Sequence, residues 1–343
     1  MINVGIVGGS GYTGAELLRL LASHPDVKVV VATSRSYADV KIDGVYPNLS
    51  GILDICFSAL DLSQLQQCDV VFFTTPHGVS QTLAPKLLNS GVKVIDLSAD
   101  FRIRDIAVWE RWYGLEHRAP ELIPRAVYGL PEFNDERIRE ADLIACPGCY
   151  PTSIQLGLLP LLRCQYLDTR DIIVNASSGV SGAGRAASLA NIYTEVGDNY
   201  KAYAADGHRH FPEVVQALKD ISGRSVGVTF VPHLLPINRG IHATIFVNLT
   251  DLDLKLHDLY TTAFVDKPFV SILPLGDHPQ TRNVRGSNFC QIGLHRPLGG
   301  RKAIILVVID NLIKGASGQA IQCMNLMFDL PETSGLTSIA CVP

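Results

Sequence analysis

The chain has 343 residues, of which 47% are hydrophobic and 18% charged, and its formal net charge is −4. This length predicts more than one domain, and the small net charge without a Lys and Arg cluster argues against a nucleic-acid partner. No apolar run is long enough to cross a membrane, and the opening residues lack the features of a signal peptide. Eight cysteines in such a chain are expected to be reduced thiols, which predicts a cytoplasmic protein.

Short β-branched runs alternate with helical patterns through the first part of the chain. The expected strands are residues 4–7, 27–32, 70–73, 92–95 and 143–145. Apolar runs separated by helices are typical of a parallel sheet that is covered on both faces. The pattern predicts an α/β fold whose first domain, residues 1–148, is a doubly wound Rossmann-type domain.

After residue 148 the pattern changes to one apolar helix followed by several strands. We expect the helix over residues 150–162 and strands over 172–176, 226–231, 241–249 and 302–309. Strands with few helices between them indicate a mixed or antiparallel sheet. Residues 149–310 are therefore predicted to form an α+β catalytic and oligomerisation domain, and a last helix, about 311–330, is expected to pack back on the first domain.

A glycine-rich turn follows the first expected strand directly and opens the first helix. Glycines in that place let the chain turn tightly, let a pyrophosphate approach, and let the helix N-terminus donate N–H groups to it. The turn predicts a dinucleotide site formed by Gly8, Ser10, Gly11, Tyr12, Thr13 and Gly14.

The end of the second expected strand indicates which dinucleotide binds. An acidic residue there is typical of NAD-binding folds, but this chain has Thr33, Ser34, Arg35 and Ser36. Two hydroxyls and a guanidinium suit a 2'-phosphate, so Ser34 and Arg35 predict NADP(H). The alternative is that Arg35 is a solvated loop residue.

Cys149 lies where a second-domain helix is expected to begin. Pro151 is tolerated only in a first helical turn, so the helix starts close to Cys149. The positive end of the helix dipole favours a thiolate there, and Gly148 leaves the sulfur accessible. These features predict a nucleophilic cysteine.

Cys146 and Cys149 also form a C-x-x-C pair, which has other interpretations. A zinc site needs further clustered ligands, and the remaining cysteines are scattered singly, so no metal is expected. A thioredoxin-type pair does not fit a chain with a dinucleotide loop. A buried inert cysteine is the common alternative, but the Pro-Gly-Cys turn argues against it.

The sequence resembles the N-acetyl-gamma-glutamyl-phosphate reductases of arginine biosynthesis, relatives of the aspartate-semialdehyde dehydrogenases. The resemblance covers nearly the whole chain, and its motifs are the glycine turn, Asp96–Arg102, Tyr128–Glu132, Pro147–Thr152, Ser178–Gly179, Ser181–Arg185, His208–Glu213, Arg239–Gly240 and Asp310–Gly315. It implies NADPH-dependent reduction of an acyl phosphate, N-acetyl-L-glutamyl 5-phosphate, to the semialdehyde and phosphate. It also implies a homodimer or homotetramer.

Such a reaction passes through a thioester on Cys149 and needs a general acid or base. We expect His210 to serve, with His208 close behind it and Glu213 as an orienting group. The sequence does not separate the two histidines.

Further residues are assigned by motif and position. Arg102, Arg185 and Arg239 suit the substrate carboxylate or phosphate, with structural ion pairs as the alternative. The residues expected on the cofactor side are Pro76, Ser178, Gly179 and Asn288.

Two alternative functions stay open at this point. An aspartate-semialdehyde dehydrogenase would use the same thiol on a shorter acyl phosphate, and a non-catalytic nucleotide sensor would retain only the dinucleotide fold. Cys146 departs from the family pattern and leaves open an oxidative shut-off in which it pairs with Cys149.

Overall fold

The structure is a computed structural model that describes residues 1–342, and it divides into two compact units. The first unit comprises Met1–Pro147 and Ala316–Thr337, and the second comprises Gly148–Gly315 and the chain from Ser338 onward. Within residues 1–342, no helix combines the length and apolar character that a membrane crossing requires.

The first unit contains a six-stranded sheet in which every strand pair is parallel. Its strands, in spatial order, are β2 (Val27–Thr33), β1 (Ile2–Val7), β3 (Val70–Phe73), β4 (Lys93–Asp96), β6 (Leu143–Ala145) and β5 (Val127–Tyr128). The order starts at β1 and extends to both sides, which is the doubly wound arrangement predicted from the alternating pattern. The Rossmann-type prediction is confirmed.

Helices connect these strands and supply the apolar faces that cover the sheet. They are α1 (Tyr12–Ala22), α2 (Ile42–Val45), α3 (Leu62–Leu65), α4 (Val79–Asn89), α5 (Ile106–Tyr113), α6 (Pro131–Arg139) and, from the end of the chain, α11 (Gly318–Met327). Every residue of α11 is buried, and the helix contacts α1 and α6. The closing segment therefore belongs to the core of the first unit.

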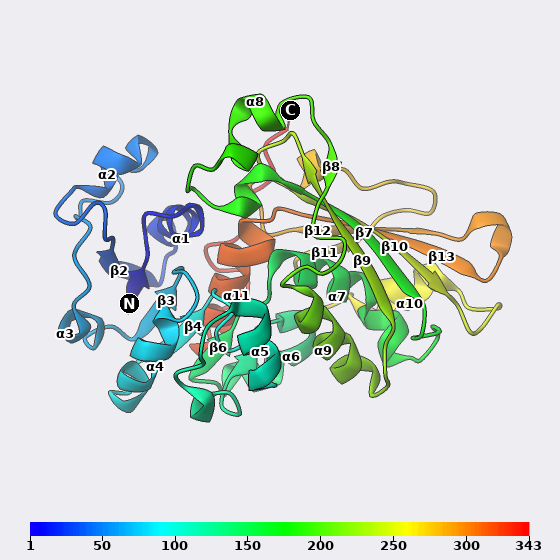
Figure 1. Cartoon of the computed structure of the whole chain (residues 1–343), viewed down its shortest axis with the longest axis horizontal. Helices are drawn as coiled ribbons and strands as arrows, with labels where there is room; N and C mark the ends of the chain where they lie inside the picture. The colour runs from blue at the N-terminus through cyan, green and yellow to red at the C-terminus, as the bar shows by residue number, and fades with distance from the viewer. Residues whose placement is uncertain (343) are drawn as a thin grey trace. The chain divides into compact units, whose positions relative to one another are not determined.

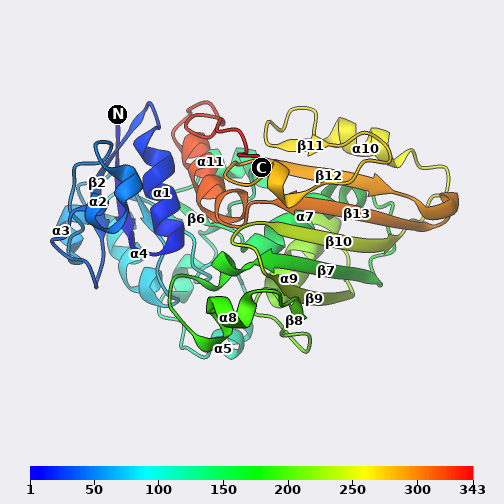
Figure 2. The ribbon, with the colours of Figure 1, turned by 90° about the horizontal axis from the view of Figure 1, so that it is seen from above.

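The second unit contains a seven-stranded mixed sheet, whose strands follow one another across Figure 2. In spatial order they are β11 (Val270–Ile272), β12 (Cys290–His295), β13 (Lys302–Ile309), β10 (Ile241–Asn248), β7 (Ile172–Gly179), β9 (Val228–Leu235) and β8 (Lys201–Ala202). The pairs β7–β9 and β11–β12 are parallel and the others are antiparallel. The expected mixed sheet is confirmed.

One face of this sheet carries α7 (Cys149–Arg163), α9 (Phe211–Ser222) and α10 (Leu256–Ala263) (Figures 1 and 2). The short helix α8 (Tyr193–Val196) belongs to the segment between β7 and β8 and does not lie with them (Figure 1). Helix α7 contacts β10, β13 and α9, and its Gly157 lies against Ile245 and Val307. Because side chains alternate along a strand, Phe246 and Ile304 point to the opposite face and stay partly exposed.

Candidate active site

The start of α7 places Cys149 as the first helical residue, as the sequence predicts from Pro151. The N-cap residue, Gly148, has no side chain that could cap the first turn. Glu213, from the first turn of α9, is fully buried, and its Oε1 accepts the Gly148 N–H at 2.9 Å. The thiol of Cys149 is partly exposed. A buried carboxylate therefore anchors the turn that presents the thiol.

His210 lies against the same turn. A Cβ atom built at Gly148 would lie 2.7 Å from Nε2 of His210, a distance that real Cβ atoms do not reach. Residue 148 must therefore be glycine for the imidazole to approach the backbone next to Cys149. His210 is 9% exposed and is the N-cap residue of α9.

His208 occupies a more enclosed position beside His210. Its Nδ1 accepts the backbone N–H of His210 at 3.1 Å, which leaves the second ring nitrogen, Nε2, as the protonated one. Its ring makes edge contacts with Tyr150, Tyr203 and Phe230. Burial, reinforced by the charge of Arg209, lowers the pKa of His208 to about 4. His208 is therefore neutral at pH 7 and supports the backbone of His210.

A pocket of 580 Å³ opens over Cys149 within the second unit. Its charged lining residues are Lys201 and Arg209, and among the described residues no Asp or Glu lines it. The other lining residues include both histidines, Ser178, Gly179, Gly182, Ala183, Ala190, Asn191, Tyr203 and Ala204. Such a pocket suits a ligand that carries negative charge.

Two tyrosines form a hydroxyl chain at the wall of this pocket. Tyr203 donates to the hydroxyl of Tyr150 at 3.1 Å, and Tyr150 donates to the carbonyl of His233 at 3.2 Å. Burial raises the pKa of both phenols, so they remain protonated donors at neutral pH. Sequence reasoning missed Lys201 and Tyr203, because they lie in and next to the two-residue strand β8, which carries no recognisable motif.

The glycine turn of the first unit has the geometry expected of a dinucleotide loop. Gly8 has a positive φ of 90°, and a Cβ at Gly14 would lie 2.6 Å from Cα of Gly9, so the helix packs directly on the turn. The Ser10 and Ser34 hydroxyls are 2.8 Å apart, which joins the turn to the end of β2. Next to them Arg35 is exposed, as are Tyr12 of the turn and Pro76 after β3, while Thr13 is half-buried.

The three arginines of the matching motifs lie in different surroundings. Arg102 is 7% exposed and donates to the carbonyls of Cys146 and Leu97, both at 2.6 Å. Arg239 pairs with buried Asp310 at 3.6 Å, and Arg185 is exposed on the loop after β7. Arg239 thus has the structural ion pair that the sequence left open as the alternative, whereas Arg102 has structural hydrogen bonds to backbone carbonyls. Asn288 is buried in the second unit.

The cysteines and the possible metal ligands bear on the other interpretations of the C-x-x-C pair. None of the eight cysteines, all within residues 1–342, forms a disulfide, and Cys146 is buried whereas Cys149 is partly exposed. In residues 1–342 no group of three or more His, Cys, Asp or Glu side chains is arranged to hold a metal ion.

Comparison with known proteins places both units in one family. The model "Semialdehyde dehydrogenase, NAD binding domain" matches residues 3–141, and "Semialdehyde dehydrogenase, dimerisation domain" matches residues 149–311. N-acetyl-gamma-glutamyl-phosphate reductases of Nitrosococcus oceani and Pseudomonas aeruginosa are each 56% identical over 344 residues and cover 100% of both chains.

Solved structures share the fold at much lower identity. Aspartate semialdehyde dehydrogenase II of Vibrio cholerae, complexed with ASA, has a TM-score of 0.74 at 18% identity and covers 96% of this chain and 98% of its own. Aspartate semialdehyde dehydrogenase of Candida albicans, solved with NADP, has a TM-score of 0.73 at 16% identity, with coverages of 96% and 99%.

The depressed pKa of His208 predicts a pH-dependent stability. Its folded pKa, about 4, lies below the ordinary 6.5, so the unfolded chain binds a proton more readily between these values. The stabilising effect of neutral His208 is complete above pH 6.5 and is lost as the pH falls toward 4. Urea unfolding at several pH values in this range gives the free energy of unfolding as a function of pH. Its slope against pH should be shallower for His208→Asn, whose side-chain oxygen can replace Nδ1 as the acceptor. Lys28→Asn, at an exposed residue of β2, should keep the wild-type slope, and identical slopes for all three proteins would contradict the assignment.

Proposed function

This chain belongs to the N-acetyl-gamma-glutamyl-phosphate reductases of the semialdehyde dehydrogenase family, and we propose that it reduces N-acetyl-L-glutamyl 5-phosphate through a thioester on Cys149. Full-length identity of 56% to reductases of that name supports this substrate over the aspartate pathway, whose enzymes match at 18%. The intact cysteine turn and its histidines also argue against a sensor without activity.

The observation that carries the proposal is the position of Cys149 at the N-terminus of α7, inside the pocket and beside His210. The positive end of the helix dipole stabilises a thiolate at this point. The thiolate attacks the carbonyl carbon of the acyl phosphate, and the bond from that carbon to the phosphate oxygen breaks. Phosphate leaves, and the acyl group remains on sulfur as a thioester.

His210 is the general acid and base in this proposal. As the acid, it donates a proton to the oxygen when the thioester is reduced to the hemithioacetal. As the base, it then removes that proton as the carbon–sulfur bond breaks, which releases the aldehyde and restores the thiolate. His208 holds the His210 backbone and stays neutral, and Glu213 holds Gly148, so both act through their neighbours. Lys201 and Arg209 offer positive charge to the carboxylate or the phosphoryl group of the substrate.

The residues of the glycine turn fit a dinucleotide. The N-cap of α1, Gly11, carries no side chain that competes for the first-turn N–H groups, which suits a pyrophosphate. Ser34 and Arg35 directly follow β2 without an acidic neighbour, which suits a 2'-phosphate and hence NADP(H). When bound, the nicotinamide supplies the hydride that reduces the thioester. We assign the cofactor-side positions to the glycine turn, Pro76, Ser178, Gly179 and Asn288, and keep Arg102, Arg185 and Arg239 as secondary substrate candidates.

We also propose that the enzyme is a cytoplasmic homodimer or homotetramer joined through the uncovered face of the seven-stranded sheet. Exposed free thiols at Cys56, Cys164 and Cys341 suit a reducing compartment. The match to a dimerisation domain covers residues 149–311, and that sheet leaves Phe246 and Ile304 partly exposed.

The thioester is tested by mass spectrometry of the protein mixed with acyl phosphate without cofactor. An adduct of the acyl mass should appear on the peptide that contains Cys149, and Cys149→Ala should abolish it. Cys164→Ala, at the opposite end of α7, is the matched control and should retain it. His210→Asn should lower kcat by about 10²- to 10⁴-fold. An adduct on another residue, or full activity of Cys149→Ala, would refute the mechanism.

The cofactor preference is tested by Arg35→Asp. Loss of a charge-assisted contact to the 2'-phosphate should raise KM for NADPH by roughly 10- to 100-fold, with little change for NADH. Lys28→Asp makes the same charge change at an exposed position of β2, the strand that precedes Arg35, and should leave both values unchanged. Equal effects on the two cofactors would exclude a 2'-phosphate contact.

The assembly is tested by Phe246→Asp, which places a charge on the uncovered sheet face. Burial of that charge in an interface is unfavourable, so light scattering at micromolar concentration should show monomers in place of the wild-type oligomer. Leu252→Asp, at a 52% exposed site outside the sheet, should keep the wild-type mass. An unchanged mass for Phe246→Asp would place the interface elsewhere.

A further inference from the structure

Gly315 lies directly against the catalytic cysteine. A Cβ atom built at Gly315 would lie 2.8 Å from Cβ and 3.2 Å from Cα of Cys149. Gly315 is not among the glycines with a positive φ, so its backbone conformation does not require glycine. The close approach to Cys149 does require glycine, because any side chain at position 315 would displace the first residue of α7 or the turn that faces it.

The path of the chain after β13 explains how Gly315 reaches this place. Residues Ile313–Ser317 form a π-helix, a rare element that often occurs at functional sites. The N–H of Gly315 donates to the carbonyl of Asp310 at 2.9 Å, which closes this wide turn. Strand β13 ends at Ile309 and pairs with β10 and β12 on its two sides. The position of Gly315 is therefore set by an interior strand of the sheet.

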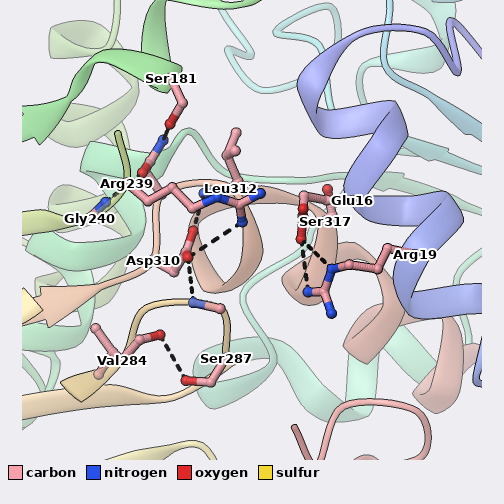
Figure 3. Close-up of polar contacts among 12 residues, drawn as sticks. Glu16, Arg19, Ser181, Arg239, Gly240, Val284, Ser287, Asp310, Leu312 and Ser317 are labelled. Carbon is pink, nitrogen blue, oxygen red and sulfur yellow. Dashed lines mark hydrogen bonds and ion pairs between the residues drawn. The ribbon is translucent and has the colours of Figure 1, made fainter. Parts of the chain in front are cut away.

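Asp310 holds the beginning of the turn, as Figure 3 shows. Its fully buried carboxylate accepts the N–H groups of Leu312 and Gly286, both at 2.8 Å, and pairs with Arg239 at 3.6 Å. A buried carboxylate with several donors is costly to disturb, because loss of one partner leaves charge uncompensated. The turn is thus held to the sheet at one end and meets Cys149 at the other.

Asn311 extends the same support to the wall of the pocket. Its Oδ1 accepts the N–H of Gly240 at 2.8 Å, and its Nδ2 donates to Oγ of Ser181 at 3.0 Å. Ser181 lies in the short turn Val180–Ala183, and Gly182 and Ala183 of that turn line the pocket. The nucleophile and part of the substrate pocket therefore share one support.

We propose that the segment Asp310–Gly315 positions the nucleophile, with Gly315 as the positioning residue that contacts Cys149 and Asp310 as the group that holds the turn in place. The inference rests on the proposed role of Cys149. Catalysis by a nucleophile at a helix terminus depends on both its distance from the substrate and its distance from the helix N–H groups. A shift of about 1 Å is enough to cost roughly 10²-fold in rate.

The test is Gly315→Ala, measured by kcat and by the pH dependence of iodoacetamide labelling of Cys149. We expect kcat to fall by about 10²-fold and the labelling midpoint to move to higher pH, because the sulfur leaves the helix terminus. The Kd for NADPH should stay within twofold, because the glycine turn and Arg35, to which the proposed phosphate contacts are assigned, belong to the other unit. Gly300→Ala is the matched control, because Gly300 has a φ of −73° that alanine adopts and is exposed.

Other results would overturn the inference. If Gly315→Ala keeps the wild-type kcat and labelling midpoint, Gly315 does not position Cys149. If it raises the Kd for NADPH and leaves labelling unchanged, residue 315 acts on the cofactor instead. Should Gly315→Ala fail to fold, Asp310→Asn replaces it and should move the labelling midpoint in the same direction, with an unchanged midpoint counting against the proposal. Full activity of Cys149→Ala would refute the proposed function itself. None of the results for Gly315→Ala or Asp310→Asn can be confused with that one.

Discussion

The hydrogen bond from the Gly148 N–H to the buried carboxylate of Glu213 is the contact that holds the parts of the candidate active site together in the second unit. It joins the turn before α7 to the first turn of α9, and each helix contributes one member of the candidate machinery. Cys149 begins one helix and His210 precedes the other. Because Glu213 is fully buried, the bond is protected from competing water and keeps a defined length.

The sequence predicts most of the fold because the central strands are continuous apolar runs. Residues 70–73 and 143–145 are buried on both faces, and this is what periodicity detects best. Strand β5 was missed because it has two residues followed by Gly-Leu-Pro, and β12 because Gln291 and Gly293 interrupt its apolar pattern. Strands β8 and β11 are also too short to show a period. Their pairing depends on neighbours that are distant in sequence.

The candidate site likewise has residues that the sequence identified and features that only the structure supplied. Cys149, Glu213 and the two histidines belong to local motifs, so spacing and helix-start signals were enough to select them. The assignment of different proposed roles to His208 and His210 required the fold. It depends on the aromatic rings around His208 and on the hydrogen bond that His208 accepts from the His210 backbone. Arg102 shows the limit of a motif, because a residue type suited to phosphate here donates to two backbone carbonyls.

The two outer strands of the seven-stranded sheet are its shortest, with two residues in β8 and three in β11. Sheet edges with long unpaired backbones invite further chains to add strands, and the end result of such growth is a fibril. Here the outer strands β8 and β11 by themselves expose too few backbone groups to template that growth. The uncovered face of the sheet can thus stay apolar enough for the proposed interface, while the short outer strands disfavour the addition of further strands.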